Sequence, residues 1–205
     1  NNDINEISNF KDQLFIDYLK DYEEDILVDG AKTFIEKNKN RPMGIVTSCN
    51  KKSAEFILEK TKLGNYMQFL IASEDCNKHK PDKEPYQKAI NILQCNQQNC
   101  TIFEDSNSGY KSAKSLGEVK ICLILNNKSS EYILSSNNYK IKSYNEFDYN
   151  KLCNNTKNDI NKLIIKKLDM IPITDVVTNE HNLKTGYICD IKSLSLIFNN
   201  SIENV

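Results

Sequence analysis

The chain has 205 residues, enough for one core domain and part of another. Its 27 Lys and Arg residues nearly balance its 28 Asp and Glu residues, so net charge predicts no attraction to nucleic acid or to a membrane surface. We find no signal-peptide pattern and no apolar run long enough to span a membrane, which predicts a cytoplasmic protein with no membrane partner.

Helices and short apolar strands are predicted to alternate along the first two thirds of the chain. An amphipathic helix over residues 4–22 comes first. The later predicted helices cover residues 31–37, 51–60 and 85–93, and the predicted strands cover residues 43–50, 70–73, 100–103 and 119–125, with an edge strand at 139–143. This alternation predicts an α/β fold, a three-layer, Rossmann-like parallel sheet with helices on both faces.

The first predicted strand ends in polar residues and leads into a helix. Thr47, Ser48 and Asn50 stand at this junction. A hydroxyl and backbone amides at a strand end that faces a helix N-terminus suit a phosphate oxygen. The alternative is that Thr47 is only the N-cap of the helix.

Lys80 is followed by Pro81 and precedes the helix that begins near Glu84. A lysine held in such a place can offset the charge of a phosphoryl group and of the carboxylates around it. In a chain this rich in lysine, Lys80 can equally be a solvated surface residue.

Two adjacent carboxylates, Glu104 and Asp105, close the apolar strand 100–103 and precede a helix start at residues 106–109. Acidic residues at the carboxyl end of a buried parallel strand lie where open α/β sheets place their ligands. With no basic neighbour in sequence, the pair favours a hard cation such as Mg²⁺. The alternative is that Asp105 only stabilises the helix start through the helix dipole.

Taken in this order, Thr47, Lys80-Pro81 and the segment from Glu104 to Gly109 resemble the haloacid dehalogenase-like hydrolases, in particular the β-phosphoglucomutase-like phosphatases and mutases. The resemblance covers roughly residues 22–125. It implies an Mg²⁺-dependent phosphatase that acts on a small phosphorylated metabolite through an aspartyl-phosphate.

The resemblance also implies a role for each matching residue. Lys80 and Thr47 would be catalytic; Thr47, Ser48, Asn50 and Lys80 would bind the substrate phosphate; Asp105 and Glu104 would hold Mg²⁺, Glu104 directly or through water.

One departure from the family pattern is serious. The family's nucleophile lies in an Asp-x-Asp strand, and residues 1–42 contain no such motif. We therefore expect the chain to be a fragment that lacks its catalytic aspartate and is inactive alone. The missing strand would lie between the strands ending at Thr47 and Glu104, where we expect an open or collapsed slot rather than a strand from elsewhere. The alternative is an inactive binding module of the same shape fused to a small-molecule kinase.

The chain is predicted to divide into four parts: a remnant of a helical cap (1–21), the α/β core (22–144), an Asn-rich linker (145–158) and the start of a second α+β domain (159–205). In the last part we predict a helix near 160–168 and strands at 173–178 and 187–198, with His181 as a turn residue between them. Residues 183–190 faintly resemble the first hairpin of choline-kinase-like and aminoglycoside-phosphotransferase-like enzymes, which suggests a fused kinase-like domain.

The seven cysteines are scattered and form no zinc-binding pattern. Cys95 and Cys100 are five positions apart, but no second pair or histidine pattern accompanies them. We expect most of the seven to be reduced thiols of the core, which implies a reducing compartment.

Overall fold

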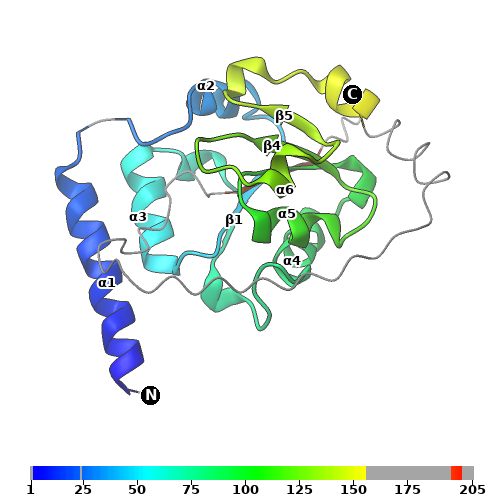
Figure 1. Cartoon of the computed structure of the whole chain (residues 1–205). Coiled ribbons are helices and arrows are strands. Elements are labelled where there is room, and N and C mark those ends of the chain that lie inside the picture. Colours follow the sequence, from blue (N-terminus) through cyan, green and yellow to red (C-terminus); the bar gives the residue numbers. More distant parts are fainter. Residues whose placement is uncertain (1, 24, 156–194, 200–205) are drawn as a thin grey trace.

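A computed structural model of the chain describes residues 2–23, 25–155 and 195–199 (Figure 1). The predicted helix near 160–168, the strand at 173–178, the turn with His181 and the kinase-like hairpin therefore lie outside the described residues. Within the described ranges, no helix is both long and apolar enough to cross a membrane.

The strands form one six-stranded sheet in the order β2-β1-β6-β3-β4-β5. Their bounds are Met43–Val46 (β1), Phe69–Ile71 (β2), Cys100–Glu104 (β3), Lys120–Ile124 (β4), Tyr139–Ile141 (β5) and Ser195–Asn199 (β6). Neighbouring strands are parallel except at β6, which is antiparallel to both β1 and β3. The predicted α/β fold with a parallel sheet is confirmed in its first five strands.

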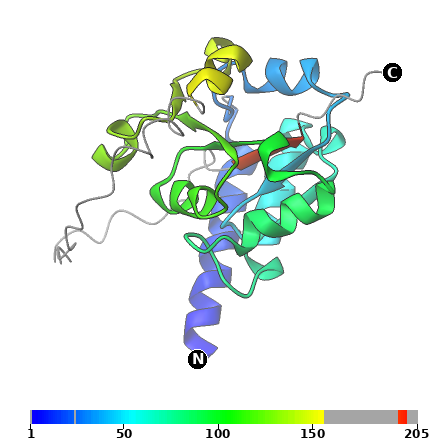
Figure 2. The ribbon, with the colours of Figure 1, turned by 90° about the vertical axis from the view of Figure 1, so that its right-hand side faces the viewer.

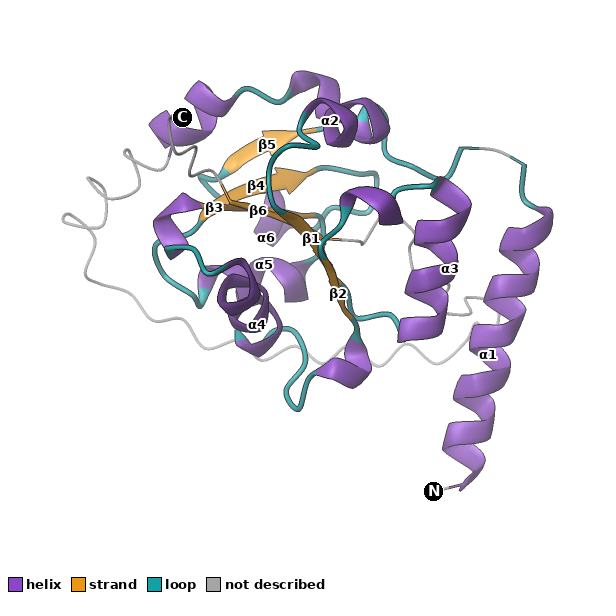
Figure 3. Ribbon diagram, turned by 180° about the vertical axis from the view of Figure 1, so that it is seen from behind, coloured by secondary structure: helices purple, strands orange, loops and turns teal. Residues whose placement is uncertain are grey.

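Helices cover both faces of the sheet (Figure 3). Their bounds are Asn2–Asp21 (α1), Ala31–Lys37 (α2), Lys51–Thr61 (α3), Glu84–Leu93 (α4), Asn107–Lys114 (α5) and Glu131–Leu134 (α6), and residues 149–155 are also helical. On one face, α4 and α5 pack in a core cluster with Ile102; on the other, α2 packs with Phe103. Successive residues of β3 thus serve opposite layers, as the pleat of a strand requires.

Helix α1 lies outside these layers and packs on α3. Leu19 and Phe15 are buried against Ile57, and α1 extends away from the rest of the molecule towards its N-terminus (Figure 1). The predicted helix is therefore present, but its apolar stripe is only partly buried, because Phe10, Leu14 and Tyr18 are exposed.

The expectation of an open or collapsed slot between the first strand and β3 is wrong. Strand β6 lies there, pairing Leu196 with Ile45 and Ile197 with Ile102 (Figure 2, red). The buried edges of β1 and β3 would otherwise face each other with unpaired N–H and C=O groups, each costing roughly 1–3 kcal/mol. An extended segment of either direction satisfies them, and here residues 195–199, predicted to belong to a second domain, do so.

The segment predicted as an Asn-rich linker from residue 145 is part of the core as far as it is described. Phe147 packs against the cluster that contains Tyr144, and Leu152, in the helical residues 149–155, is only 1% exposed. The asparagines suggested a linker, but the apolar residues among them are buried on the α2 face of the sheet.

Candidate functional site

The candidate site is centred on the ammonium group of Lys80, which lies between the carboxyl ends of β1 and β3. Its Nζ donates to Glu104 Oε1 at 2.6 Å, to Tyr86 Oη at 3.0 Å and to the carbonyl oxygen of Val46 at 3.1 Å. The side chains of Lys80 and Glu104 are only 4% and 1% exposed. A buried charge pair persists when its remaining donors and acceptors are also satisfied, and three acceptors meet the three ammonium hydrogens here.

Glu104 is surrounded by donors on both of its oxygens. Oε1 accepts from Lys80 and from the Tyr86 hydroxyl. Oε2 accepts from the backbone N–H groups of Asp105 and Ser106 at 3.1 and 3.2 Å and from Ser106 Oγ at 3.0 Å. These bonds hold the carboxylate in one position and leave it poorly suited to bind a metal ion directly.

Gly109 allows the start of α5 to lie against this carboxylate. Its N–H donates to Ser106 Oγ at 3.0 Å, so Ser106 caps the helix while it contacts Glu104. A Cβ atom at position 109 would stand 1.9 Å from Glu104 Oε1. The sequence Glu-Asp-Ser-x-x-Gly thus has a local physical reason: the cap is a serine, and the residue opposite the carboxylate has no side chain.

A second set of polar residues lies at the junction of β1 and α3. Thr47 is 4% exposed, and its Oγ1 accepts from the N–H of Cys49 at 3.1 Å. Asn50 is the N-cap of α3, its Oδ1 accepting from the N–H of Ser53 at 2.7 Å. Ser48 is exposed. The capping role considered for Thr47 therefore belongs to Asn50.

Glu74 occupies part of the same helix N-terminus. Both of its carboxylate oxygens lie 3.0 Å from the backbone nitrogen of Lys51, the first residue of α3. The amides of Ser48 and Asn50 donate to no acceptor in the described ranges, so they remain available to an anion.

The loop before α4 positions Lys80. Glu84, at the start of α4, accepts from the backbone N–H groups of Asn77 and Lys78, both at 2.9 Å. A hydrogen bond from Lys88, followed by these backbone bonds, lowers the pKa of Glu84 to about 2. The ionised carboxylate therefore ties the loop to the helix at neutral pH.

Asp105 is the carboxylate of the adjacent pair that is not buried. It is half-buried, and its Oδ2 accepts from Asn126 Nδ2 at 3.4 Å. Mg²⁺ is commonly held by one or two carboxylates together with water and substrate phosphate, so Asp105 fits as one ligand. In the described part of the chain no three His, Cys, Asp or Glu residues are grouped to hold a metal ion, so Asp105 supplies only part of a donor set.

The three predicted motifs meet at one place. Lys80 contacts Val46 and Glu104, and each of these directly precedes a predicted site residue, Thr47 and Asp105. The ammonium group of Lys80 pairs with Glu104 at 2.6 Å. Neighbouring residues at a strand end point in opposite directions, and the spacing alone could not say which of them faces the lysine.

Two participants were not singled out from the sequence. Tyr86, near the start of α4, contacts both Lys80 and Glu104. Asn126, which follows the predicted strand 119–125, contacts Asp105. Its place directly beyond a buried strand was the available signal, because the carboxyl ends of parallel strands share one edge of a sheet.

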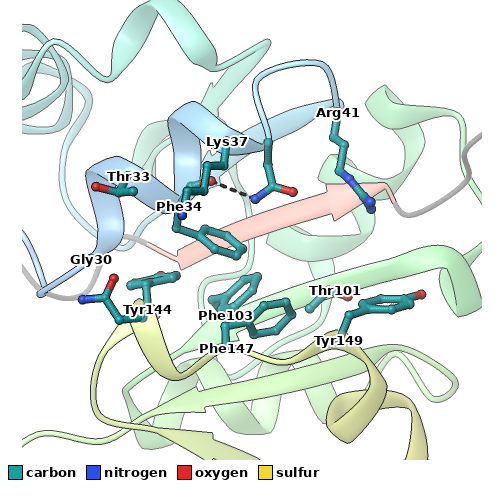
Figure 4. A pocket seen from close by; sticks show the side chains of 12 residues that line it. Gly30, Thr33, Phe34, Lys37, Arg41, Thr101, Phe103, Tyr144, Phe147 and Tyr149 are labelled. Atoms are coloured by element: carbon teal, nitrogen blue, oxygen red, sulfur yellow. Dashed lines mark hydrogen bonds between the residues drawn. The ribbon is translucent and has the colours of Figure 1, made fainter.

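A hollow of about 370 Å³ lies elsewhere, on the face of the sheet that α2 covers. Figure 4 shows the rings of Phe34, Phe103 and Phe147 gathered in its middle, with Arg41 and Tyr149 at one end. None of the predicted site residues lines it. The hollow therefore does not coincide with the charged centre at Lys80.

Comparison with known proteins gives consistent matches. A family model described as haloacid dehalogenase-like hydrolase matches residues 3–124. A validoxylamine A 7'-phosphate phosphatase of Streptomyces hygroscopicus subsp. limoneus is 31% identical over 101 residues, 48% of this chain and 47% of that protein. A phosphorylated carbohydrates phosphatase of Thermotoga maritima is 30% identical over 111 residues, 54% of this chain and 50% of that protein.

Solved structures share the fold. A HAD hydrolase of family IA, variant 3, from Entamoeba histolytica has a TM-score of 0.55 and 27% identity, covering 63% of this chain and 60% of that one. A β-phosphoglucomutase from Clostridium difficile has a TM-score of 0.53 and 18% identity, covering 65% of this chain and 57% of that one. The chain spans half or less of the length of the two curated relatives named above.

Proposed function

This chain belongs to the haloacid dehalogenase-like hydrolases, and on that premise we propose that its protein is a phosphatase acting on a small phosphorylated metabolite. Two of the relatives are phosphatases whose names give their substrates as validoxylamine A 7'-phosphate and as phosphorylated carbohydrates. The observation that carries the proposal is the buried Lys80 ammonium held between the ends of β1 and β3.

In this proposal Lys80 acts as a fixed positive charge beside the phosphoryl group. Its three protein acceptors hold it in place before substrate arrives, so no reorganisation is needed when negative charge develops. Glu104 is a positioning residue, because it holds Lys80 and both of its own oxygens are already bonded.

Thr47 and its neighbours are proposed to bind the phosphoryl oxygens. The Thr47 oxygen accepts from Cys49, which leaves its hydroxyl hydrogen to donate to substrate. Ser48 offers an exposed hydroxyl and a backbone amide, and Asn50 offers its own amide beside the helix start that it caps.

Asp105 is proposed to hold Mg²⁺, which when bound would neutralise charge on the phosphoryl oxygens. We propose Glu104 as a neighbour of the metal site rather than a direct ligand, because its oxygens already accept from five donors.

The nucleophile is proposed to be an aspartate of the complete protein outside these 205 residues. Its carboxylate would attack phosphorus, the bond to the leaving oxygen would break, and water would then hydrolyse the aspartyl-phosphate. A phosphomutase would differ only in the last step, where a sugar hydroxyl takes the place of water.

The test is turnover of an aryl phosphate by the complete protein and by the 205-residue chain. We expect Mg²⁺-dependent hydrolysis by the complete protein only. Lys80→Ala or Asp105→Ala should each lower kcat/KM on the order of 10²-fold or more, as loss of a preorganised charge does. Lys78→Ala, which removes an exposed lysine two positions away, is the matched control and should leave kcat/KM unchanged. Metal-dependent turnover by the 205-residue chain would overturn the proposal that the nucleophilic aspartate lies outside it.

An inactive phosphate-binding module, with a kinase-like domain fused to it, is the second candidate. The observation that favours an inactive module is the antiparallel β6, which occupies the central position between β1, directly before Thr47, and β3, which ends at Glu104. Such a module would bind inorganic phosphate and lose that binding in Lys80→Ala. It would show no hydrolysis by the complete protein with any metal.

A further inference from the structure

Two cysteines outside the candidate site lie unusually close together. Cys95 Sγ and Cys100 Sγ are 2.7 Å apart, and both are free thiols. Cys100 is the first residue of β3 and is fully buried, whereas Cys95 follows α4 and is half-buried. A disulfide has a sulfur–sulfur bond of about 2.05 Å, so the two thiols need to move by less than an ångström to reach bonding distance.

The short segment between the two residues already brings their side chains together. A 3₁₀ turn, Gln97–Asn99, reverses the chain, and Cys100 Sγ contacts the carbonyl oxygen of Asn96 at 3.6 Å. Lys120 donates to the carbonyl oxygen of Gln98 in the same segment. Among the other described cysteines, Cys49, Cys76 and Cys122 are buried free thiols and Cys153 is a half-buried free thiol.

We propose that Cys95 and Cys100 form a reversible redox site, a dithiol that a low-molecular-weight disulfide converts to an intramolecular disulfide. The bond would join the end of α4 to the start of β3. These two elements carry Tyr86 and Glu104 at their opposite ends, so the disulfide would tie together the two elements that hold Lys80. The proposal does not depend on the phosphatase proposal.

The reaction is a pair of thiol–disulfide exchanges. Cys95, the more accessible thiol, loses its proton to solvent and attacks one sulfur of the small disulfide, releasing one small thiol and forming a mixed disulfide. Cys100 then loses its proton and attacks Cys95 Sγ, which releases the second small thiol. Two electrons pass from the cysteine pair to the small disulfide, and the two lost protons end on the two thiols that leave.

Burial opposes the second deprotonation, and the nearby charge favours it. Removal from water raises the pKa of the Cys100 thiol, the hydrogen bond to Cys95 raises it further, and the Lys120 ammonium lowers it. The closeness of the two sulfurs offsets this disadvantage, because the second exchange is intramolecular.

The experiment exposes the folded 205-residue chain to oxidised glutathione, quenches it with acid and digests it with trypsin. Cleavage after Lys88 and Lys111 places both cysteines on one peptide, residues 89–111, which contains no other cysteine. We expect this peptide to lose the mass of two hydrogens and both alkylation sites, and a thiol reductant to restore them. Cys153, which is also half-buried, should form a mixed disulfide with glutathione instead of an intramolecular disulfide.

Variants separate the two steps. In Cys100→Ala, the mixed disulfide between Cys95 and glutathione should be trapped. In Cys95→Ser, Cys100 should remain unmodified. Circular dichroism checks that each variant is folded. Cys153→Ser should leave the 89–111 disulfide unchanged. Two free thiols on peptide 89–111 when Cys153 carries glutathione would overturn the proposal. A stable glutathione adduct on Cys95 of the unmutated chain would overturn it too.

Discussion

At the scale of single residues, the site depends on one buried ion pair and the groups that complete it. Lys80 and Glu104 are both almost fully removed from water, and each is surrounded by hydrogen-bond partners. A buried pair of this kind contributes little to stability when it is intact, but loss of one partner leaves an uncompensated charge in the core.

Lys80→Met should lower the free energy of unfolding by about 3–5 kcal/mol, because it leaves the Glu104 carboxylate buried without its cation. Urea unfolding measures the change. Lys78→Met is the matched control: Lys78 is 73% exposed and lies 3.9 Å from Asp82, so its loss should cost about 0–1 kcal/mol. Equal losses in the two variants would contradict a buried, paired Lys80.

Gly109→Ala should destabilise the protein by about 1–3 kcal/mol, the usual cost of forcing atoms into a packed core. Alanine normally favours a helix over glycine, but here its Cβ would overlap the Glu104 carboxylate. Gly64→Ala provides the comparison, because the nearest neighbour of a Cβ there would be Leu58 Cβ, at an ordinary contact distance of 3.7 Å. Thermal or urea unfolding of both variants tests this, and stabilisation by Gly109→Ala would refute the close approach.

At the scale of elements, the start of α4 determines where Lys80 lies. The loop before this helix is held by backbone bonds to Glu84, while Tyr86 on the next part of the helix faces the ammonium group. Helix α4 thus supplies the Glu84 carboxylate, which binds the loop backbone, and the Tyr86 hydroxyl, which accepts a hydrogen bond from Lys80.

The contribution of Glu84 to stability should depend on pH. Its pKa is lowered from 4.5 to about 2, chiefly by the hydrogen bond from Lys88. A depressed pKa means that the folded state favours the ionised form, so the stabilisation is complete above 4.5 and is lost as the pH falls towards 2. The melting temperature of Glu84→Gln should therefore lie below that of the unmutated chain at neutral pH, and the two should converge in acid.

Glu55→Gln is the control for this pH series, since Glu55 is exposed on α3 and makes no side-chain hydrogen bond in the described ranges. A gap between the Glu84→Gln and unmutated melting temperatures that stayed constant from neutral pH to strong acid would count against an ionised Glu84 tie.

At the scale of the whole molecule, β6 makes the sheet continuous. The two groups of parallel strands, β2-β1 and β3-β4-β5, are joined through this antiparallel strand. Pairing is extensive on both sides: Met43 to Val46 pair with β6 on one edge, and Cys100 to Phe103 pair on the other. The backbone pairing of β1 and of β3, which are far apart in the sequence, therefore depends on the same five-residue segment.

Ile197→Pro should lower the free energy of unfolding by roughly 1–3 kcal/mol or more, because proline removes an N–H from a strand bonded on both edges. Ile202→Pro, beyond the end of β6, is the matched control and should cost less. Hydrogen exchange of the Ile45 and Ile102 amides in the two variants shows whether protection is lost in the strands that flank β6. Equal stability of both variants would mean that β6 does not hold the centre of the sheet.

The sequence by itself determined the alternation of elements and the residues at the strand ends. The spacing of apolar residues and the turn-forming residues act locally. The sequence therefore predicted α2 and the strands beginning at Met43 and Cys100 within a few residues of their bounds. The order of the polar motifs along a parallel sheet was enough to expect Lys80 and the carboxylates on one edge, because parallel strands end on the same side.

Only the tertiary structure decided which groups meet. That Lys80 pairs with Glu104 depends on the direction in which the Glu104 side chain leaves the strand end. That Gly109 lies against Glu104, and Cys95 against Cys100, depends on how closely helices approach the sheet. The central strand shows the same limit: unpaired backbone groups accept an extended segment from any part of the chain and in either direction, so no local pattern specifies residues 195–199 as that strand.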